Sequence, residues 1–217
     1  MRTKYFEHHE LFVAEELDTT TIDGLRHYKT PTGEVYKSVT TVLSSLTAKA
    51  RSEWRDKVGH DTARKISSAA ARRGVNLHTV VEKYLKNDEM FLVEQMPTIS
   101  VLFNSIRNIL DTHIGLVYGQ EFCLYSHTLK TAGRCDLFCQ FDGINTVVDI
   151  KSSSKVKRVE WIENYFIQAT AYALMIQERY NIDVPDIAIV IAVEHNEPQV
   201  FKEKVQTYTS RVREVFG

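Results

Sequence analysis

Two opposite charges end an apolar run near the middle of the chain. The stretch TVVDIKSSSKV, residues 146–156, carries Asp149 and Lys151 two positions apart. Because alternate side chains of a β-strand point to the same face, Asp149 and Lys151 face one side, and Val148 and Ile150 face the core. Such a strand delivers a carboxylate and an ammonium group together at its end. The pair is interpreted either as a structural salt bridge or as part of an active site.

A second carboxylate lies in the strand predicted just before this one. The segment GRCDLF contains Asp136, and a hairpin register between the two strands can place Asp136 beside Asp149. Two carboxylates that close repel each other unless a cation lies between them. Oxygen ligands favour Mg²⁺ or Mn²⁺. The pattern therefore predicts a divalent cation site next to Lys151.

Two predicted helices carry further polar pairs, each spaced by one helical turn. His78 and Glu82 lie on one helix face, with Gly74 one turn earlier. Glycine costs a helix about 1 kcal/mol relative to alanine, which suggests that the backbone at Gly74 lies near a bulky group. Neutral imidazole is a suitable ligand for Mn²⁺. The other pair is Gln168 and Tyr172. Most histidine, glutamine and tyrosine residues on helices are surface or packing residues, so each pair is informative only together with the charged residues of the strands.

The elements expected around these residues form a mixed α/β layer. Three strand candidates follow one another, LVYGQEFCLYS, TAGRCDLFCQF and NTVVDIKSS, joined by the short links HTLK and FDGIN. Short polar links of this kind are typical of antiparallel hairpins. A helix over about 159–180 then leads to the strand DIAIVIAVEH and a strand-like return, QVFKEKV. We therefore predict a central mixed sheet, made of a three-strand antiparallel meander, a crossover helix and a further strand, flanked by helices.

We expect residues 1–68 to form an N-terminal hairpin and helical appendage, and residues 69–217 to form the core. The appendage contains the hairpin HYKTPTGEVYKSVT, a short helix after Ser38 and a helical stretch over 48–68. No repeat, low-complexity tract or Gly/Ser linker marks the boundary, so the division is not a clean one.

Two more helices are expected ahead of the sheet. One covers residues 69–86, where apolar residues recur at helical spacing. The other begins after Pro97, with Thr98 as its N-cap. Together with the helix at 159–180, they supply the helical cover that the sheet needs.

The composition is that of a soluble globular protein, with 43% hydrophobic and 25% charged residues among 217. No apolar run approaches the ~20 residues that a membrane helix needs, and the N-terminal sequence has no signal-peptide or transit-peptide pattern. These features predict a cytoplasmic protein. Cys123, Cys135 and Cys139 are too few and too poorly spaced for a disulfide framework, a zinc site or a four-thiolate iron–sulfur cluster, and we expect them in the core.

The formal net charge of -1 argues against a protein that coats nucleic acid through charge alone. Basic residues are nevertheless clustered in two places, interpreted either as solvated helix faces or as nucleic-acid contacts. The first cluster comprises Lys49, Arg51, Arg55, Lys57, Arg64, Lys65, Arg72 and Arg73, and the second Lys151, Lys155, Lys157 and Arg158.

These motifs, taken in order, resemble the PD-(D/E)XK nucleases of the RecB exonuclease type. The series is G-x-x-x-H-x-x-x-E, a strand glutamate, G-x-x-D, D-x-K and Q-x-x-x-Y, carried here by Gly74, His78, Glu82, Glu121, Gly133, Asp136, Asp149, Lys151, Gln168 and Tyr172. More narrowly, SVTTVLSS, SEWRDK and AAARRGVNLH resemble the mitochondrial genome maintenance exonuclease family and its bacteriophage relatives. The resemblance covers roughly residues 35–195, and residues 1–30 match nothing.

The resemblance implies a restriction-endonuclease-like core that hydrolyses phosphodiester bonds with one or two divalent cations, Mg²⁺ or Mn²⁺, and no iron–sulfur cluster. By analogy, the metal is held by His78, Asp136, Asp149 and the carbonyl of Ile150. Lys151 then orients the attacking water and stabilises charge on phosphate, with a general-base role as an alternative. Gln168 and Tyr172 position Lys151, water or phosphate, and Glu121 is an outer metal partner or a brace for Lys151.

DNA is the expected partner, single-stranded or with free ends. The residues expected to contact it are Arg72, Arg73, Gly74, Ser152, Ser153, Lys155 and Lys157. Trp54, Tyr165 and Phe166 are candidates for stacking on unpaired bases, with core packing as the alternative.

Three functions fit these expectations. The leading one is a metal-dependent exonuclease in phage-type DNA recombination, repair or degradation. The second is a structure-specific endonuclease with the same active site. The third is a non-catalytic nucleic-acid-binding protein that keeps a nuclease fold.

Overall fold

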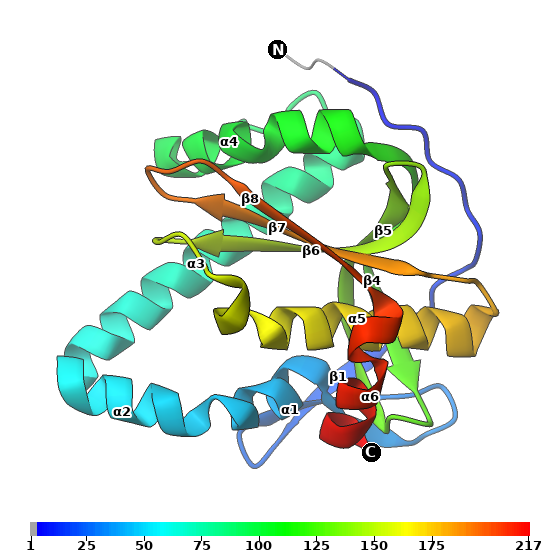
Figure 1. Cartoon of the computed structure of the whole chain (residues 1–217), viewed down its shortest axis with the longest axis horizontal. Coiled ribbons are helices and arrows are strands. Elements are labelled where there is room, and N and C mark those ends of the chain that lie inside the picture. Colours follow the sequence, from blue (N-terminus) through cyan, green and yellow to red (C-terminus); the bar gives the residue numbers. More distant parts are fainter. Residues whose placement is uncertain (1–3) are drawn as a thin grey trace.

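The computed structural model describes residues 4–217, and in this part of the chain the strands form one eight-stranded mixed sheet flanked by helices (Figure 1). The strand order is β1-β2-β3-β5-β6-β7-β8, and β4 pairs with the other edge of β5. The strands are β1 (Asp18–Ile22), β2 (Leu25–Lys29), β3 (Val35–Ser38), β4 (Ile114–Ser126), β5 (Thr131–Phe141), β6 (Ile144–Ser153), β7 (Asp186–Val193) and β8 (Gln199–Lys204).

The central part of the sheet has the predicted order. Strands β4, β5 and β6 form the antiparallel meander, β6 pairs with β7 in parallel through the crossover helix α5 (Glu163–Tyr180), and β8 returns antiparallel to β7. The hairpin of β2 and β3 is also confirmed. Strand β1 and the C-terminal helix α6 (Val205–Phe216) add to the elements that the sequence predicted.

Strand β5 shares one of its edges between two partners. Its first residues pair in parallel with β3, at Thr131 and Ala132, whereas its last residues, from Leu137 to Phe141, pair with β6. Residues 133–136 lie between these two pairings. The sheet is therefore forked at this point, and residues 133–136 line the fork.

Both faces of the sheet are covered by helices. Helices α1 (Val39–Leu46), α5 and α6 pack on one face, and α3 (His60–Leu85) and α4 (Pro97–His113) pack on the other (Figure 1). Along β6, Val147 packs toward α5, while Val148 and Ile150 pack toward α3 and α4, as the alternation predicts. Because the sheet is covered on both sides, the face that carries Asp149 is buried too.

The helical region before the sheet differs from the prediction in two places. Instead of separate helices over 48–68 and 69–86, α2 (Ala48–Val58) ends at Gly59, and α3 runs unbroken from His60. Gly59 has a φ of 85°, a backbone conformation that favours glycine and interrupts the helix. Thr98 is not the N-cap of α4, because the helix begins at Pro97, whose missing N–H costs nothing at the first position.

The expected boundary after residue 68 falls inside α3, and the N-terminal part joins the sheet through the pairing of β3 with β5. The division into an appendage and a core stays a prediction. A short 3₁₀ helix, η1 (Val159–Trp161), precedes α5. Residues 4–217 include no helix that is both long and apolar enough to cross a membrane.

The segment before β1 runs along β4, at the edge of the sheet (Figure 1). The backbone N–H of His9 donates to the Val117 carbonyl, and the Val117 N–H donates to the Glu7 carbonyl, both at 2.9 Å. Phe6 and Phe12 add to the packing on opposite faces of the sheet. This segment satisfies backbone groups that an edge strand otherwise exposes.

The three cysteines are buried, as expected for small core side chains, and form no disulfide within the described residues. Burial raises the pKa of the Cys135 and Cys139 thiols well above their ordinary range. Both thiols are therefore in the neutral form, which is a poor metal ligand.

Candidate active site

A cavity of about 530 Å³ opens at the fork of the sheet. Strands β2 to β6 and helices α1, α3 and α5 contribute to its wall, so residues far apart in the sequence meet there. The lining residues are Arg26, Tyr28, Ser38, Thr40, Gly74, Val75, His78, Thr79, Glu82, Glu121, Gly133, Arg134, Asp136, Lys151, Gln168 and Tyr172.

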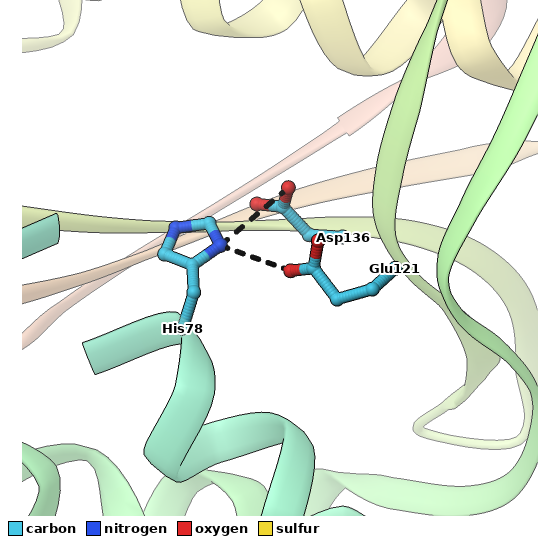
Figure 2. Close-up of side chains that lie close together, drawn as sticks. All are labelled: His78, Glu121 and Asp136. Atoms are coloured by element: carbon cyan, nitrogen blue, oxygen red, sulfur yellow. Dashed lines mark hydrogen bonds and ion pairs between the residues drawn. The ribbon is translucent and has the colours of Figure 1, made fainter. Parts of the chain in front are cut away.

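Three of these residues bring possible metal ligands together. His78 of α3, Glu121 of β4 and Asp136 of β5 each have a ligand atom within 4.8 Å of the others (Figure 2). The Nδ1 atom of His78 lies 3.2 Å from Oε1 of Glu121 and 3.7 Å from Oδ1 of Asp136. One imidazole nitrogen and two carboxylates form a mixed set that suits Mn²⁺ and tolerates Mg²⁺. The residues present therefore fit a divalent cation.

The imidazole of His78 occupies the centre of this group. Its Nε2–H donates to the Ile150 carbonyl at 2.8 Å, while Nδ1 faces the two carboxylates. Burial lowers the pKa of His78, but Asp136 and Glu121 outweigh it and raise the pKa to about 9. A protonated His78 thus balances the carboxylates in this structure, as a bound cation would.

Glu121 reaches the group from an unusual backbone conformation. Its φ is 47°, in the left-handed region, although the residues around it continue strand β4. For a residue other than glycine this conformation costs on the order of 1–2 kcal/mol. The surrounding contacts must therefore hold Glu121 in place.

Asp136 lies beside Asp149, as the hairpin register predicts. The pairing of β5 with β6 ends at Leu137 and Val148, one residue short of the two aspartates. The Ile150 N–H donates to Oδ2 of Asp136 at 2.9 Å, which ties Asp136 to the end of β6. Asp149 stands next to the His78, Glu121 and Asp136 group rather than within it.

Asp149 and Lys151 contact each other on the α5 side of the sheet. Oδ2 of Asp149 lies 2.5 Å from Nζ of Lys151, and the Asp149 side chain is only 2% exposed. Among the described residues no regular hydrogen bond reaches either Asp149 oxygen, so the ion pair is the contact that compensates its burial. Burial raises the pKa of Asp149, and the nearby ammonium group offsets this only in part.

The charge state of Lys151 follows from the same pair. Burial lowers the pKa of the ammonium group, but Asp149 and Asp136 outweigh it, so the pKa of Lys151 is raised. The Lys151 ammonium group can therefore act as a hydrogen-bond donor beside Asp149.

Helix α5 places Gln168 and Tyr172 against the cavity, as their one-turn spacing allows, and both are largely buried. The Tyr172 hydroxyl explains the glycine of the G-x-x-D motif. A Cβ atom at Gly133 would lie 2.6 Å from Oη and 2.9 Å from Cε1 of Tyr172. Gly133 therefore makes room for the tyrosine at the fork.

Gly74 faces the cavity. A Cβ atom at Gly74 would meet no atom of the described residues within 4 Å. The bulky group expected there is therefore not a part of the described chain. His78 and Glu82 line the cavity from the same helix.

Some of the residues expected to contact DNA are held by other parts of the protein, and others are exposed. Arg73 donates to Oγ of Ser152 at 3.4 Å and pairs with Glu194 at 3.2 Å, so it connects α3 with β6 and the turn after β7. The Ser153 hydroxyl is buried and donates to the Lys155 carbonyl, which shapes the turn after β6. Arg72 and Lys155 are exposed, and Lys157 is held through its backbone by Gln199.

The three aromatic candidates for base stacking also differ. Phe166 is buried and stacks on Tyr208, so it is a core residue. The Tyr165 ring lies 5.4 Å from Nζ of Lys151. Trp54 lines a small cavity together with Arg51 and Arg55 of α2.

Two charged cavity residues were not singled out from the sequence. Arg134 stands inside the motif GRCD, so its position beside Asp136 is a signal that could have revealed it. Arg26 comes from the N-terminal hairpin, and its position in the sequence gives no such signal. The cavity therefore carries more positive charge than Lys151 alone provides.

No protein-family profile and no curated protein matches this chain. Among solved structures, it is similar to a candidate exonuclease from Eubacterium rectale, with 12% sequence identity and a TM-score of 0.40 over 67% of this chain and 66% of that one. It is also similar to the protein SSO0001, with 14% identity and a TM-score of 0.38 over 80% of this chain and 73% of that one. At this level of similarity neither structure carries information about function.

Proposed function

We propose that the protein is a metal-dependent deoxyribonuclease of the PD-(D/E)XK type, an exonuclease that hydrolyses phosphodiester bonds in single-stranded DNA or at free DNA ends. Phage-type recombination, repair or degradation of DNA is the process in which we place it. The observation that carries the proposal is the convergence of His78, Glu121 and Asp136 with the Asp149 and Lys151 pair at the fork of the sheet.

The metal ligands in this proposal are His78, Asp136, Asp149 and the Ile150 carbonyl, and the Glu121 carboxylate lies close enough to His78 and Asp136 to act as a further ligand or an outer partner. A divalent cation bound there would polarise the phosphate and lower the pKa of a bound water. The protein prepares the site by placing the Glu121 and Asp136 carboxylates 3.2 Å and 3.7 Å from Nδ1 of His78 and by burying Asp149 at the end of β6, where it pairs with Lys151. Taking up a cation requires His78 to lose its extra proton, because only neutral imidazole is a ligand.

Lys151 is the proposed catalytic donor. Its ammonium group lines the cavity next to Asp149 and can donate to a phosphate oxygen or to the attacking water. Gln168 and Tyr172 close the α5 side of the cavity and limit where a phosphate can lie. A general-base role for Lys151 would first need its pKa to fall, because Asp149 and Asp136 raise it.

The proposed DNA contacts extend on either side of the cavity. Gly74 leaves open space at the cavity wall, and Lys155 lies just beyond Lys151 on the turn after β6. Ser152, Ser153, Arg72, Arg73 and Lys157 complete the proposed set. Contacts of this kind to phosphates weaken as salt concentration rises.

The direct test is cleavage of end-labelled single-stranded DNA. We expect cleavage that needs Mg²⁺ or Mn²⁺, stops in excess EDTA and is lost in Lys151→Ala. Lys204→Ala is the matched control, because Lys204 pairs with Asp186 at the start of β7, the opposite end of the sheet from Lys151. Full activity of Lys151→Ala, or activity in EDTA, would contradict the proposal.

A covalently closed single-stranded circle separates the two nuclease hypotheses. An exonuclease that needs an end leaves the circle intact, whereas a structure-specific endonuclease opens it. Linear DNA labelled at either end gives the polarity in the same experiment. A protein that binds DNA but neither cleaves it nor binds Mn²⁺ would instead favour the non-catalytic hypothesis.

A further inference from the structure

Arg134 contacts the backbone of a residue in the proposed metal site. It lies on β5 directly opposite Cys123 of β4, and its Nη1 atom donates to the Glu121 carbonyl at 2.8 Å. Nη2 of the same guanidinium lies 3.8 Å from the Cys123 sulfur. The side chain thus bridges the two strands at the point where Glu121 departs from regular strand geometry.

The departure at Glu121 decides where its carboxylate points. Successive residues of a regular strand alternate between faces, and Phe122 and Leu124 pack into the core on the α5 side. The left-handed conformation of Glu121, with φ at 47°, interrupts this alternation and accompanies the contact of its carboxylate with His78 of α3. The same conformation orients the carbonyl that receives the Arg134 hydrogen bond.

Arg134 also forms an ion pair, which is weaker than its hydrogen bond to the Glu121 carbonyl. Nη2 lies 3.7 Å from Oε2 of Glu16, whose side chain is 85% exposed. Exposed ion pairs contribute little and are screened by salt. The Glu121 carbonyl is therefore the main partner of the guanidinium.

We propose that Arg134 is a positioning residue, which fixes Glu121 in its left-handed conformation and thereby sets the affinity of the site for a divalent cation. The inference rests on the proposed metal site. It assigns to Arg134 an action through Glu121, and not a contact with the cation or with DNA. Removing groups that orient metal ligands typically lowers metal affinity by about 10-fold to 100-fold.

The sign of the effect separates positioning from simple charge. Arg134 lines the same cavity as the ligands, so its positive charge repels a bound cation. If charge were its whole influence, Arg134→Ala would bind Mn²⁺ more tightly. Positioning predicts the opposite, weaker binding.

The experiment is calorimetric titration of Mn²⁺, without DNA, into the wild type and a set of variants of the full chain. We expect the dissociation constant of Arg134→Ala to rise by about 10-fold to 100-fold. Arg26→Ala is the matched control, because Arg26 lines the same cavity but, within residues 4–217, forms no hydrogen bond or ion pair with Glu121. Its dissociation constant should stay the same or fall.

A double-mutant cycle shows whether Arg134 acts through Glu121. In a Glu121→Gln background, Arg134→Ala should change Mn²⁺ affinity by less than about 2-fold, since additivity fails for residues that act together. Arg134→Gln, which keeps a donor, gives a second variant if Arg134→Ala does not fold, and we expect an intermediate loss. Circular dichroism of each variant checks the fold.

Each outcome decides the inference. Unchanged or tighter Mn²⁺ binding by Arg134→Ala overturns it, and loss of DNA affinity alone would make Arg134 a phosphate contact instead. An equal loss in the Glu121→Gln background also overturns it. A wild-type protein that takes up no Mn²⁺ overturns both this inference and the proposed metal site.

Discussion

Substituting Gly133 by alanine tests the packing at the fork of the sheet. The added methyl group would lie 2.6 Å from Oη, 2.9 Å from Cε1 and 3.2 Å from Cζ of Tyr172. Tyr172 is 2% exposed and sits on a helix that packs into the core, so neither partner can move freely. Overpacking of this kind costs about 1–3 kcal/mol. We expect Gly133→Ala to lower the free energy of unfolding by this amount.

The assay is urea unfolding, followed by circular dichroism, of Gly133→Ala and of two companion variants. Tyr172→Phe removes the 2.6 Å contact but not the 2.9 Å contact with Cε1. Combined with Gly133→Ala, it should therefore recover only part of the lost stability.

The matched control is Gly74→Ala, where a Cβ atom meets no described atom within 4 Å. Alanine in a helix is favoured over glycine by about 0.5–1 kcal/mol, so this variant should be more stable than the wild type. The reasoning is refuted if Gly133→Ala unfolds like the wild type, or if both glycine variants change stability in the same direction.

Three further predictions concern other parts of the molecule. Hydrogen bonds from the hydroxyls of Thr30 and Thr32 hold the pKa of Glu34 at about 2, below its ordinary 4.5. The stability that Glu34 contributes is therefore present above pH 4.5 and is lost as pH falls toward 2. An NMR titration of the Glu34 carboxyl measures this pKa, and Thr30→Val should raise it. Lys155→Ala should weaken DNA binding and reduce the slope of log K against log salt by about 1, measured by fluorescence anisotropy at several salt concentrations. Ile189→Ala, in the fully buried strand β7, should cost about 2–5 kcal/mol of unfolding free energy in a urea titration.

The central sheet could be predicted from the sequence because short turns and strand alternation are visible within a few neighbouring residues. The meander from β4 to β6 is joined by short turns, and alternation along β6 correctly separates Asp149 from Val148 and Ile150. The pairing of β3 with β5 lies outside such patterns. This pairing joins Lys37 to Thr131, which are 94 residues apart, and no turn or residue spacing in the sequence predicts it.

Two backbone conformations could not be predicted from residue type. Gly59 interrupts a helix while Gly74 does not, although both stand among helix-forming residues. Glu121 has a left-handed backbone in a sequence that reads as a plain strand, and its carboxylate contacts His78 of a distant helix. Residue type alone does not reveal such conformations.

The fork also makes the cavity wall uneven in its resistance to local opening. Among residues 4–217, the three strands β1–β3 pair with β5 only at Lys37 with Thr131 and Ser38 with Ala132, supported by the small cluster around Tyr28 and Tyr125. Strands β6 and β7, by contrast, pair along eight consecutive residues between two layers of helices. Segments with few buried contacts open at a lower free energy than the whole protein. Native-state hydrogen exchange should therefore show the amides of β2 and β3 exchanging well before those of β6 and β7, with one wall of the cavity opening while the carboxylates stay in place.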